Sequence, residues 1–288
     1  MSRFVRMAAP SFDRVGPIPP DSPVILSVPH AGREYPLQLR AAAAVPVASM
    51  LALEDRHADD VALAARIDET VFVQRRARAW IDLNRGEDER DPMIDDGARP
   101  IPAGAAATKL RSGLGLVPRR SAPGVAIWNR RLGDDEVRQR IVQDHRPYHS
   151  ALADALAVAR ERFGAALLLD VHSMPPLPGG AAARVVIGDR FGRSAGGRLV
   201  HRLEGEVVAT GHRAALNTPY PGGYILSRHG RPHEHIHAIQ IEIDRRLYLD
   251  PGLTLPGKGL AGTAALLRRM IDAVTDELLT GGLALAAE

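Results

Sequence analysis

The segment AALLLDVHS, residues 165–173, contains the clearest strand in the sequence. Its first five residues are apolar without a polar alternate, which is typical of a strand buried on both faces of a parallel sheet. Polar side chains follow at Asp170 and His172, two residues apart, so both should point to the same face of the strand. The segment predicts a sheet in the interior of the protein, with reactive groups at its carboxyl end.

Strands and helices alternate on both sides of this segment. Further strands are expected at residues 23–29, 70–75, 79–83, 184–188 and 237–243, and helices at 49–68, 134–163, 194–210 and 262–279. Such alternation favours a mostly parallel, mixed sheet with helices on both faces. We expect a single three-layer α/β domain over residues 1–288, in which residues 1–22 form an irregular lead-in. In the helix 134–163, Asp134 or Asp135 is the expected cap and Pro147 the expected break.

The composition is that of a globular protein, and it argues against several functional classes. The 288 residues are 45% hydrophobic and 25% charged, which excludes wholesale disorder and a fibrous protein. The absence of cysteine excludes disulfides, thiolate zinc sites and cysteine nucleophiles. A net charge of +3 and 4% aromatic residues do not support nucleic-acid binding. Because there is neither an apolar run of ~18 residues nor a secretory signal, we expect a soluble cytoplasmic enzyme without a membrane partner.

Side chains with catalytic potential follow several of the predicted strands. His30, Asn84, Arg85, His172 and Glu242 all lie within the last residues of a strand or just after it. In open α/β sheets, ligands bind at the carboxyl ends of the strands, so these groups are expected to share one edge. The predicted helix 49–68 brings further polar groups, which are Glu54, Asp55, His57 and Asp59.

These residue types are the parts that metal-assisted amide hydrolysis requires. Two histidines and a carboxylate with an open fourth position form a hydrolytic zinc site, although manganese, cobalt and iron accept similar ligands. An arginine beside such a site can hold a substrate carboxylate through two hydrogen bonds. A glutamate, here Glu242, can take a proton from water and pass it to the leaving nitrogen. Each histidine could instead be a structural residue at a strand end, and Glu242 could lie on a half-exposed edge strand.

Two segments are expected to form loops around the site. Residues 86–125 make a long polar stretch with glycine and proline, far longer than ordinary connections of about 4–6 residues, and are either a functional lid or disordered. The motifs Gly222-Gly223-Tyr224 and Arg228-His229-Gly230 indicate a flexible loop that covers the substrate. Tyr224 and Arg228 are therefore candidate substrate-binding residues, with a simple glycine turn as the alternative.

Six short blocks together resemble the N-formylglutamate amidohydrolase family. They match the family in order and spacing and span roughly residues 24–250. The blocks are SVPHAGREYP (27–36), EDRHADDVA (54–62), IDLNRGEDERDP (81–92), LLLDVHSMP (167–175), PGGYILSRHGRP (221–232) and HAIQIEIDRRLYLD (237–250). The family is similar in turn to the zinc carboxypeptidase and aspartoacylase group, so the resemblance implies a zinc carboxypeptidase-like fold and the removal of an acyl group from an amino acid.

The resemblance also implies the metal ligands. His30 matches the first histidine of the family, and His172 matches the second, in the Asp-x-His block. The carboxypeptidase group places its carboxylate ligand three residues after the first histidine, where this chain has Arg33, which does not bind zinc. Two carboxylates remain as candidates: Asp55, which we prefer, and Glu34. Zinc is the expected cofactor, and another divalent metal is the alternative.

The remaining site residues follow from the same resemblance. Asn84 and Arg85 match the pair that grips the substrate carboxylate, and Glu242 matches the general base and acid. Arg78 lies close to, but out of register with, an arginine that polarises the scissile carbonyl in aspartoacylase-like members. The expected ligand is a small N-acyl amino acid such as N-formylglutamate, cleaved to formate and glutamate. The alternatives are a related N-acyl amino acid deacylase or carboxypeptidase-like peptidase, and a non-catalytic relative that binds an amino acid.

Overall fold

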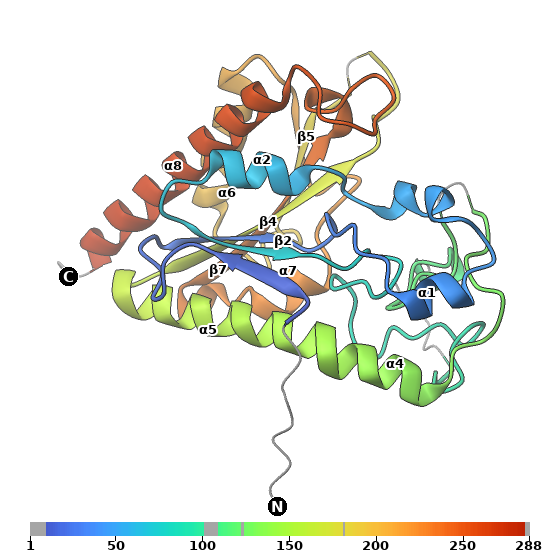
Figure 1. Cartoon of the computed structure of the whole chain (residues 1–288). Helices are drawn as coiled ribbons and strands as arrows, with labels where there is room; N and C mark the ends of the chain where they lie inside the picture. Colours follow the sequence, from blue (N-terminus) through green and yellow to red (C-terminus); the bar gives the residue numbers. More distant parts are fainter. Residues whose placement is uncertain (1–9, 101–108, 122–123, 181, 286–288) are drawn as a thin grey trace, which may run out of the picture.

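A seven-stranded mixed sheet forms the centre of the protein in the computed structural model, which describes residues 10–100, 109–121, 124–180 and 182–285 (Figure 1). The strands are β1 (Phe12–Val15), β2 (Val24–Val28), β3 (Thr70–Gln74), β4 (Ala166–Met174), β5 (Val185–Gly188), β6 (Ala214–Leu216) and β7 (Ile236–Asp244). Their order across the sheet is β1-β3-β2-β4-β7-β5-β6. β3, β2, β4 and β7 are mutually parallel, whereas β1 runs antiparallel to β3 and β5 antiparallel to β7. This confirms the predicted mixed, mostly parallel sheet.

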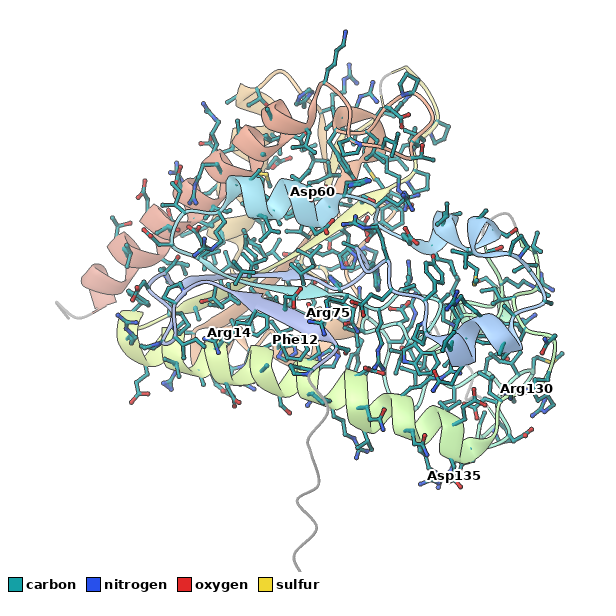
Figure 2. All side chains as sticks on the ribbon, in the orientation of Figure 1. Phe12, Arg14, Asp60, Arg75, Arg130 and Asp135 are labelled. Carbon is teal, nitrogen blue, oxygen red and sulfur yellow. The ribbon has the colours of Figure 1, made fainter. Side chains whose placement is uncertain are left out.

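Helices cover both faces of the sheet, which confirms the predicted layers (Figure 1). The longer helices are α2 (Ala58–Ala65), α4 (Asp134–Arg140), α5 (Arg146–Phe163), α6 (Gly197–Ala209) and α8 (Leu260–Leu285), and the short ones are α1 (Leu37–Ala42) and α7 (Tyr224–His229). α2, α6 and α8 pack on one face, and α4, α5 and α7 on the other. Phe12 of β1 points toward α5, where its ring meets that of Tyr148 edge-on at 5.3 Å (Figure 2).

The alternation of side chains along β4 divides the core and places the site. Leu167 and Leu169 pack on the α8 side, whereas Ala166 and Leu168 pack on the α5 side. The α5 face of β4 continues with Asp170 and then His172, so it changes from apolar to polar at the carboxyl end of the strand. β7 repeats this pattern, because Ile239, Ile241 and Ile243 pack on the α8 side while Gln240 and Glu242 alternate with them.

The predicted helix 134–163 is formed, with a different cap and a different irregularity. Gly133, and neither of the two aspartates, is the N-cap, and both carboxylates lie in the first turn of α4, where they favour the positive end of the helix. A π-helical turn at Ile141–His145 joins α4 to α5. Pro147 lies in the first turn of α5, where its missing N–H costs little.

Two predicted elements are wrong. Residues 79–83 form turns instead of a strand, with the Trp80 amide bonded to the Ala77 carbonyl at 2.8 Å. The apolar run 79–83 indicates burial under α4 and α5, and a buried turn can produce the same apolar pattern as a buried strand. The helix expected at 49–68 is interrupted: it comprises 3-10 turns at Val47–Ser49 and Leu51–Leu53 and then α2. Between them the chain is extended at Glu54 and left-handed at His57, so Asp55 lies in a loop and not on a helix face.

Three further segments differ from expectation. Part of the lead-in 1–22 forms the edge strand β1, and its residues 1–9 lie outside the described part. The segment 222–230, expected to be a flexible loop, contains α7, whose Ile225 and Leu226 are fully buried. The long stretch 86–125 forms turns, isolated bridges and a helical segment at 109–111 where it is described, and residues 101–108 and 122–123 lie outside that part. None of the helices in the described part of the chain is long and apolar enough to span a membrane.

Candidate metal centre

Three predicted metal ligands come together at the carboxyl edge of the sheet. His30 follows β2, His172 lies in β4, and Asp55 reaches them from the loop before α2, held there by a hydrogen bond from its amide to the His30 carbonyl at 2.9 Å. All three are buried, and one ligand atom from each lies within 4.8 Å of the others. The two imidazole rings are 4.7 Å apart between centroids. The convergence predicted from distant parts of the sequence is therefore present.

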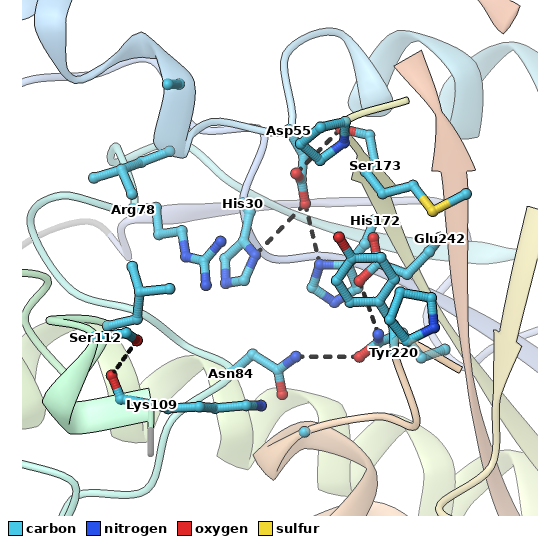
Figure 3. Close-up of a pocket in the computed structure, with 18 of the residues that line it drawn as sticks. His30, Asp55, Arg78, Asn84, Lys109, Ser112, His172, Ser173, Tyr220 and Glu242 are labelled. Atoms are coloured by element: carbon cyan, nitrogen blue, oxygen red, sulfur yellow. Dashed lines mark hydrogen bonds and ion pairs between the residues drawn. The ribbon is translucent and has the colours of Figure 1, made fainter. Parts of the chain in front are cut away.

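Each imidazole is held so that one nitrogen faces the centre. Nε2 of His30 donates to Asp82 at 2.7 Å, and Nε2 of His172 donates to Asp170 at 2.8 Å. Their Nδ1 atoms face Oδ2 of Asp55, at 3.5 Å and 3.1 Å (Figure 3). The Nδ1 atom of His30 is buried and has no hydrogen-bond partner. A carboxylate behind each histidine fixes its tautomer and leaves the other nitrogen available to a metal, so these residues fit a divalent ion.

The carboxylates behind the histidines are themselves anchored. Asp82 accepts hydrogen bonds from Nε of Arg78 at 2.9 Å and from the Asn84 amide at 2.8 Å. Asp170 accepts one from Ser27 at 2.7 Å. Such support prevents either carboxylate from turning toward the metal position, which leaves Asp55 as the acidic group that faces it.

The Asp55 carboxylate is supported on its outer side. Its Oδ1 atom accepts from Ser173 at 3.1 Å and lies 3.3 Å from Nη2 of Arg245. Arg245 also donates to Ser173 at 3.0 Å and to the Glu54 carbonyl at 2.7 Å. One oxygen of Asp55 therefore faces the two histidines, and the other faces Arg245.

Neighbouring groups keep the carboxylates of this centre ionised. Burial would raise the pKa of Asp55, but the hydrogen bond from His172 and the nearby imidazoles of His172 and His30 hold it well below its usual range. Burial likewise opposes ionisation of Asp82, and the Arg78 charge lowers the pKa of that carboxyl. For His172, burial lowers the pKa, but Asp170 and Asp55 raise it well above its usual value. The centre thus presents a strongly anionic surround to a cation.

Glu242 lies beside this centre, and its pKa is shifted in the opposite direction from those of Asp55 and Asp82. In the β4–β7 ladder it is paired with His172, and it is 8% exposed. Burial and the Asp55 charge raise the pKa of Glu242 to about 7, with His172 acting in the opposite sense. Its Oε1 atom accepts from Gln240, whose own oxygen accepts from Asn84 at 3.3 Å. A carboxylate with a pKa near neutrality can both accept and return a proton.

A cavity of about 580 Å³ opens onto these groups. Most of the predicted site residues line it, as Figure 3 shows for those that it labels. They are His30, Asp55, Arg78, Asn84, Arg85, His172 and Glu242. The loop 219–223 forms part of the wall. The cavity therefore joins the metal centre, a base and several cationic side chains in one space.

Arg85 has room for a ligand. Its Nε donates to the Leu114 carbonyl at 2.9 Å and its Nη1 to the Asn84 carbonyl at 3.3 Å. The nearest carboxylates, Asp82 and Glu89, are each 3.7 Å away, beyond hydrogen-bonding distance. The guanidinium keeps donors free for an anion in the cavity.

Three other predicted residues lie away from the cavity lining. The alternative ligand Glu34 is exposed and pairs with Arg75 at 3.3 Å. Tyr224 is half-buried and packs against His145 and His149, with ring centroids 5.4 Å and 5.1 Å away. Arg228 is exposed and donates to the Tyr224 hydroxyl at 3.2 Å. The geometry thus favours Asp55 over Glu34, and it places Tyr224 and Arg228 behind the cavity wall.

Several residues of the site were not predicted. Asp82 stands in a run that was interpreted as a strand, and a buried acid within apolar residues was the available signal. Gln240 alternates with Glu242 along β7, so its place on the same face was visible in the pattern. Lys109 and Arg245 carried no local signal, because contacts between distant segments bring them to the cavity.

Comparisons with known proteins identify the family of this chain. The model of the N-formylglutamate amidohydrolase family matches residues 22–249. An N-formylglutamate deformylase of Pseudomonas putida is 32% identical over 79% of this chain and 82% of its own length, and one of Pseudomonas aeruginosa is 28% identical over 90% and 94%. The crystal structure of N-formylglutamate amidohydrolase from Ralstonia eutropha JMP134 has a TM-score of 0.84 and 32% identity, covering 95% of this chain and 100% of that one. The chain belongs to the N-formylglutamate amidohydrolase family.

Proposed function

We propose that this protein is a metal-dependent amidohydrolase that cleaves N-formylglutamate to formate and glutamate. The buried group His30, Asp55 and His172 beside Glu242, in a cavity that also contains Arg85, carries the proposal. Support also comes from the 32% identity to a deformylase named for this substrate. Hydrolysis of an amide needs a polarised carbonyl, a proton acceptor and a held substrate, and these residues can supply the last two directly.

His30, Asp55 and His172 would hold the metal. A divalent ion at this position supplies a Lewis acid, which polarises the amide carbonyl and makes the attacking water more acidic. Zinc suits two imidazoles and one carboxylate, and manganese, cobalt or iron are alternatives that metal analysis distinguishes. The support is the orphaned Nδ1 atom of His30 and the carboxylates that hold both rings.

Glu242 would move the proton. Its carboxylate accepts a proton from water as the oxygen attacks the formyl carbon, and it then returns that proton to the nitrogen of glutamate as the C–N bond breaks. The pKa of about 7 allows both steps near neutral pH. Gln240 orients the carboxylate by donating to one oxygen, at 2.9 Å.

Arg85 and Asn84 would hold the substrate by its α-carboxylate. Arg78, which is fixed by Asp82 at 2.8 Å, would add positive charge near the amide oxygen, where negative charge develops. Because Tyr224 and Arg228 do not line the cavity, their predicted contact with the substrate requires α7 to move toward it.

The test is formate release from N-formyl-L-glutamate by the purified protein, beside deacylation of N-acetyl- and N-succinyl-L-glutamate. We expect Glu242→Gln to lower kcat by about 10²- to 10⁴-fold while the metal content is unchanged. The exposed Glu161→Gln in α5 is the matched control and should behave as the wild type. Turnover retained in Glu242→Gln would remove Glu242 from the mechanism. Faster removal of an acetyl or succinyl group than of the formyl group would favour the related deacylase. Ligand binding without any turnover would favour the non-catalytic alternative.

A further inference from the structure

The cavity is strongly cationic, beyond what the reaction itself requires. Two carboxylates line it, Asp55 and Glu242, in the described part of the chain. The cationic side chains that line it are Arg78, Arg85, Lys109, Arg120 and Arg245. A cavity with this excess of positive charge favours a ligand with more than one negative charge.

Most of this charge near the metal centre is already engaged. Arg78 is paired with Asp82 at 2.8 Å, and Arg245 with Asp55 at 3.3 Å. Arg85, as described above, has no carboxylate within hydrogen-bonding distance. The ammonium group of Lys109 has no ion pair or hydrogen bond to any residue that the structure describes. Arg85 and Lys109 are thus two cations near one another that a ligand can still use.

Lys109 is distinctive in the sequence as well as in the cavity. The chain has 37 lysines and arginines, and only Lys109 and Lys258 among them are lysines. Lys109 belongs to the segment 109–121, which forms one wall of the cavity, and its side chain extends beneath Asn84 (Figure 3). Desolvation and the Arg85 charge lower the pKa of Lys109, while Asp82 and Glu89 act in the opposite sense. An anion beside it would relieve both unfavourable effects.

We propose that Lys109 binds the side-chain carboxylate of the substrate while Arg85 binds its α-carboxylate, so that the cavity selects N-acyl derivatives of acidic amino acids. This rests on the proposed function. The α-carboxylate lies two bonds from the amide nitrogen, so it must bind close to the metal centre, where Arg85 is 3.7 Å from the Asp82 that holds His30. The side-chain carboxylate lies farther from that nitrogen, and Lys109 is a second cation of the cavity lining that is exposed to solvent.

The kinetic test compares N-formyl-L-glutamate with its neutral isostere N-formyl-L-glutamine. In Lys109→Met we expect kcat/KM for the glutamate substrate to fall about 10- to 100-fold, mainly through KM, because a charge-assisted contact is lost. The value for the glutamine substrate should change less than about twofold, and Lys109→Arg should restore most of the preference. Lys258→Met, at an exposed turn before α8, is the matched control and should match the wild type. Equal losses for both substrates, or no loss for either, would overturn the proposal.

A second measurement needs no turnover and no change at Lys109. An amine-reactive reagent labels both lysines, and peptide mass spectrometry reports each one separately. With Glu242→Gln protein, saturating N-formyl-L-glutamate should slow labelling of Lys109 several-fold and leave Lys258 unaffected, whereas N-formyl-L-glutamine should protect neither. Protection by both ligands, or by neither, contradicts the role of Lys109. Protection by the dicarboxylate, together with no formate release by the wild-type protein, would retain this role and reject the proposed function.

Discussion

Two groups of buried histidines lie close to the same cavity, and they are built in opposite ways. His30 and His172 meet at 4.7 Å between ring centroids. In the second group, His149 lies 4.4 Å from His145 and 5.3 Å from His229. All five are buried to a similar degree, so burial and ring contact do not separate a metal centre from a packed cluster.

The hydrogen-bond partners separate them. The first two histidines donate to the carboxylates Asp82 and Asp170. In the second group, the partners are neutral: His149 donates to the Leu83 carbonyl at 3.0 Å and accepts from His229 at 3.0 Å. Carboxylate partners favour a cation between the rings, and carbonyl partners favour neutral imidazoles.

The second group still serves the site, through the backbone. His145 donates to the Arg85 carbonyl at 2.8 Å, and His149 holds the Leu83 carbonyl, so the two fix the residues on either side of Asn84. Asn84 in turn accepts from the Ile225 amide of α7 at 2.9 Å. The neutral histidines thus position the predicted substrate-binding pair, while the two histidines with carboxylate partners are the candidate metal ligands.

The largest expected effect comes from removing the metal. Dialysis of the protein against a chelator should lower formate release by more than about 100-fold, and added zinc should restore it, because Lewis-acid assistance contributes several kcal/mol. A protein that keeps its full rate after the metal has been removed and assayed as absent would contradict this.

The next largest effect is expected from the carboxylates that accept hydrogen bonds from His30 and His172. Asp82→Asn and Asp170→Asn should each weaken metal binding by about 10- to 100-fold, since they no longer orient and polarise the imidazoles. Competition with a chromogenic chelator measures this affinity. Asp154→Asn, at an exposed position on α5, is the control. Unchanged affinity in both variants would show that these carboxylates do not support the ligands.

The neutral group predicts a dependence of stability on pH. Burial, and then the repulsion that a protonated His149 would meet from His145 and His229, keep the pKa of His149 well below 6.5, and burial lowers the pKa of His229 to about 3. These imidazoles stay neutral in the folded protein and bind a proton when it unfolds. Their contribution to the free energy of unfolding is therefore complete above pH 6.5 and is lost progressively as the pH falls below that value.

The matched variant is His149→Gln, which keeps a donor for the Leu83 carbonyl. Between pH 6.5 and 5, it should reduce the slope of the free energy of unfolding against pH by up to about 1.4 kcal/mol per pH unit, the value for one proton. Urea unfolding at several pH values gives this slope. A slope equal to that of the wild type would mean that His149 is protonated in the folded state.

The sequence predicted the candidate metal ligands better than it predicted the residues that hold them in place. His30, His172 and Glu242 follow or end strands that are apolar enough to identify, so their meeting at one edge follows from parallel topology. Asp55, the preferred carboxylate, lies beside both histidines, but it was placed on a predicted helix that the structure replaces with a loop. The bond from its amide to His30 is a tertiary contact, and local periodicity does not report such contacts.

Asp82 and the second histidine group show why the rest was not predicted. An apolar run such as 79–83 indicates burial but does not distinguish a strand from packed turns. His145 and His149 lie in a helix that is predicted without any contribution from them, so the pattern gives no sign of their role in the site. Their function depends on carbonyls about 60 residues away in the chain, and no spacing rule connects the two.

The most direct test of the account is metal stoichiometry by elemental analysis after equilibrium dialysis against zinc. The wild type and His149→Gln should each hold about one ion per chain, and His30→Ala should hold almost none, because only the group with carboxylate partners binds metal. A full ion in His30→Ala, or none in the wild type, would contradict the assignment of the centre.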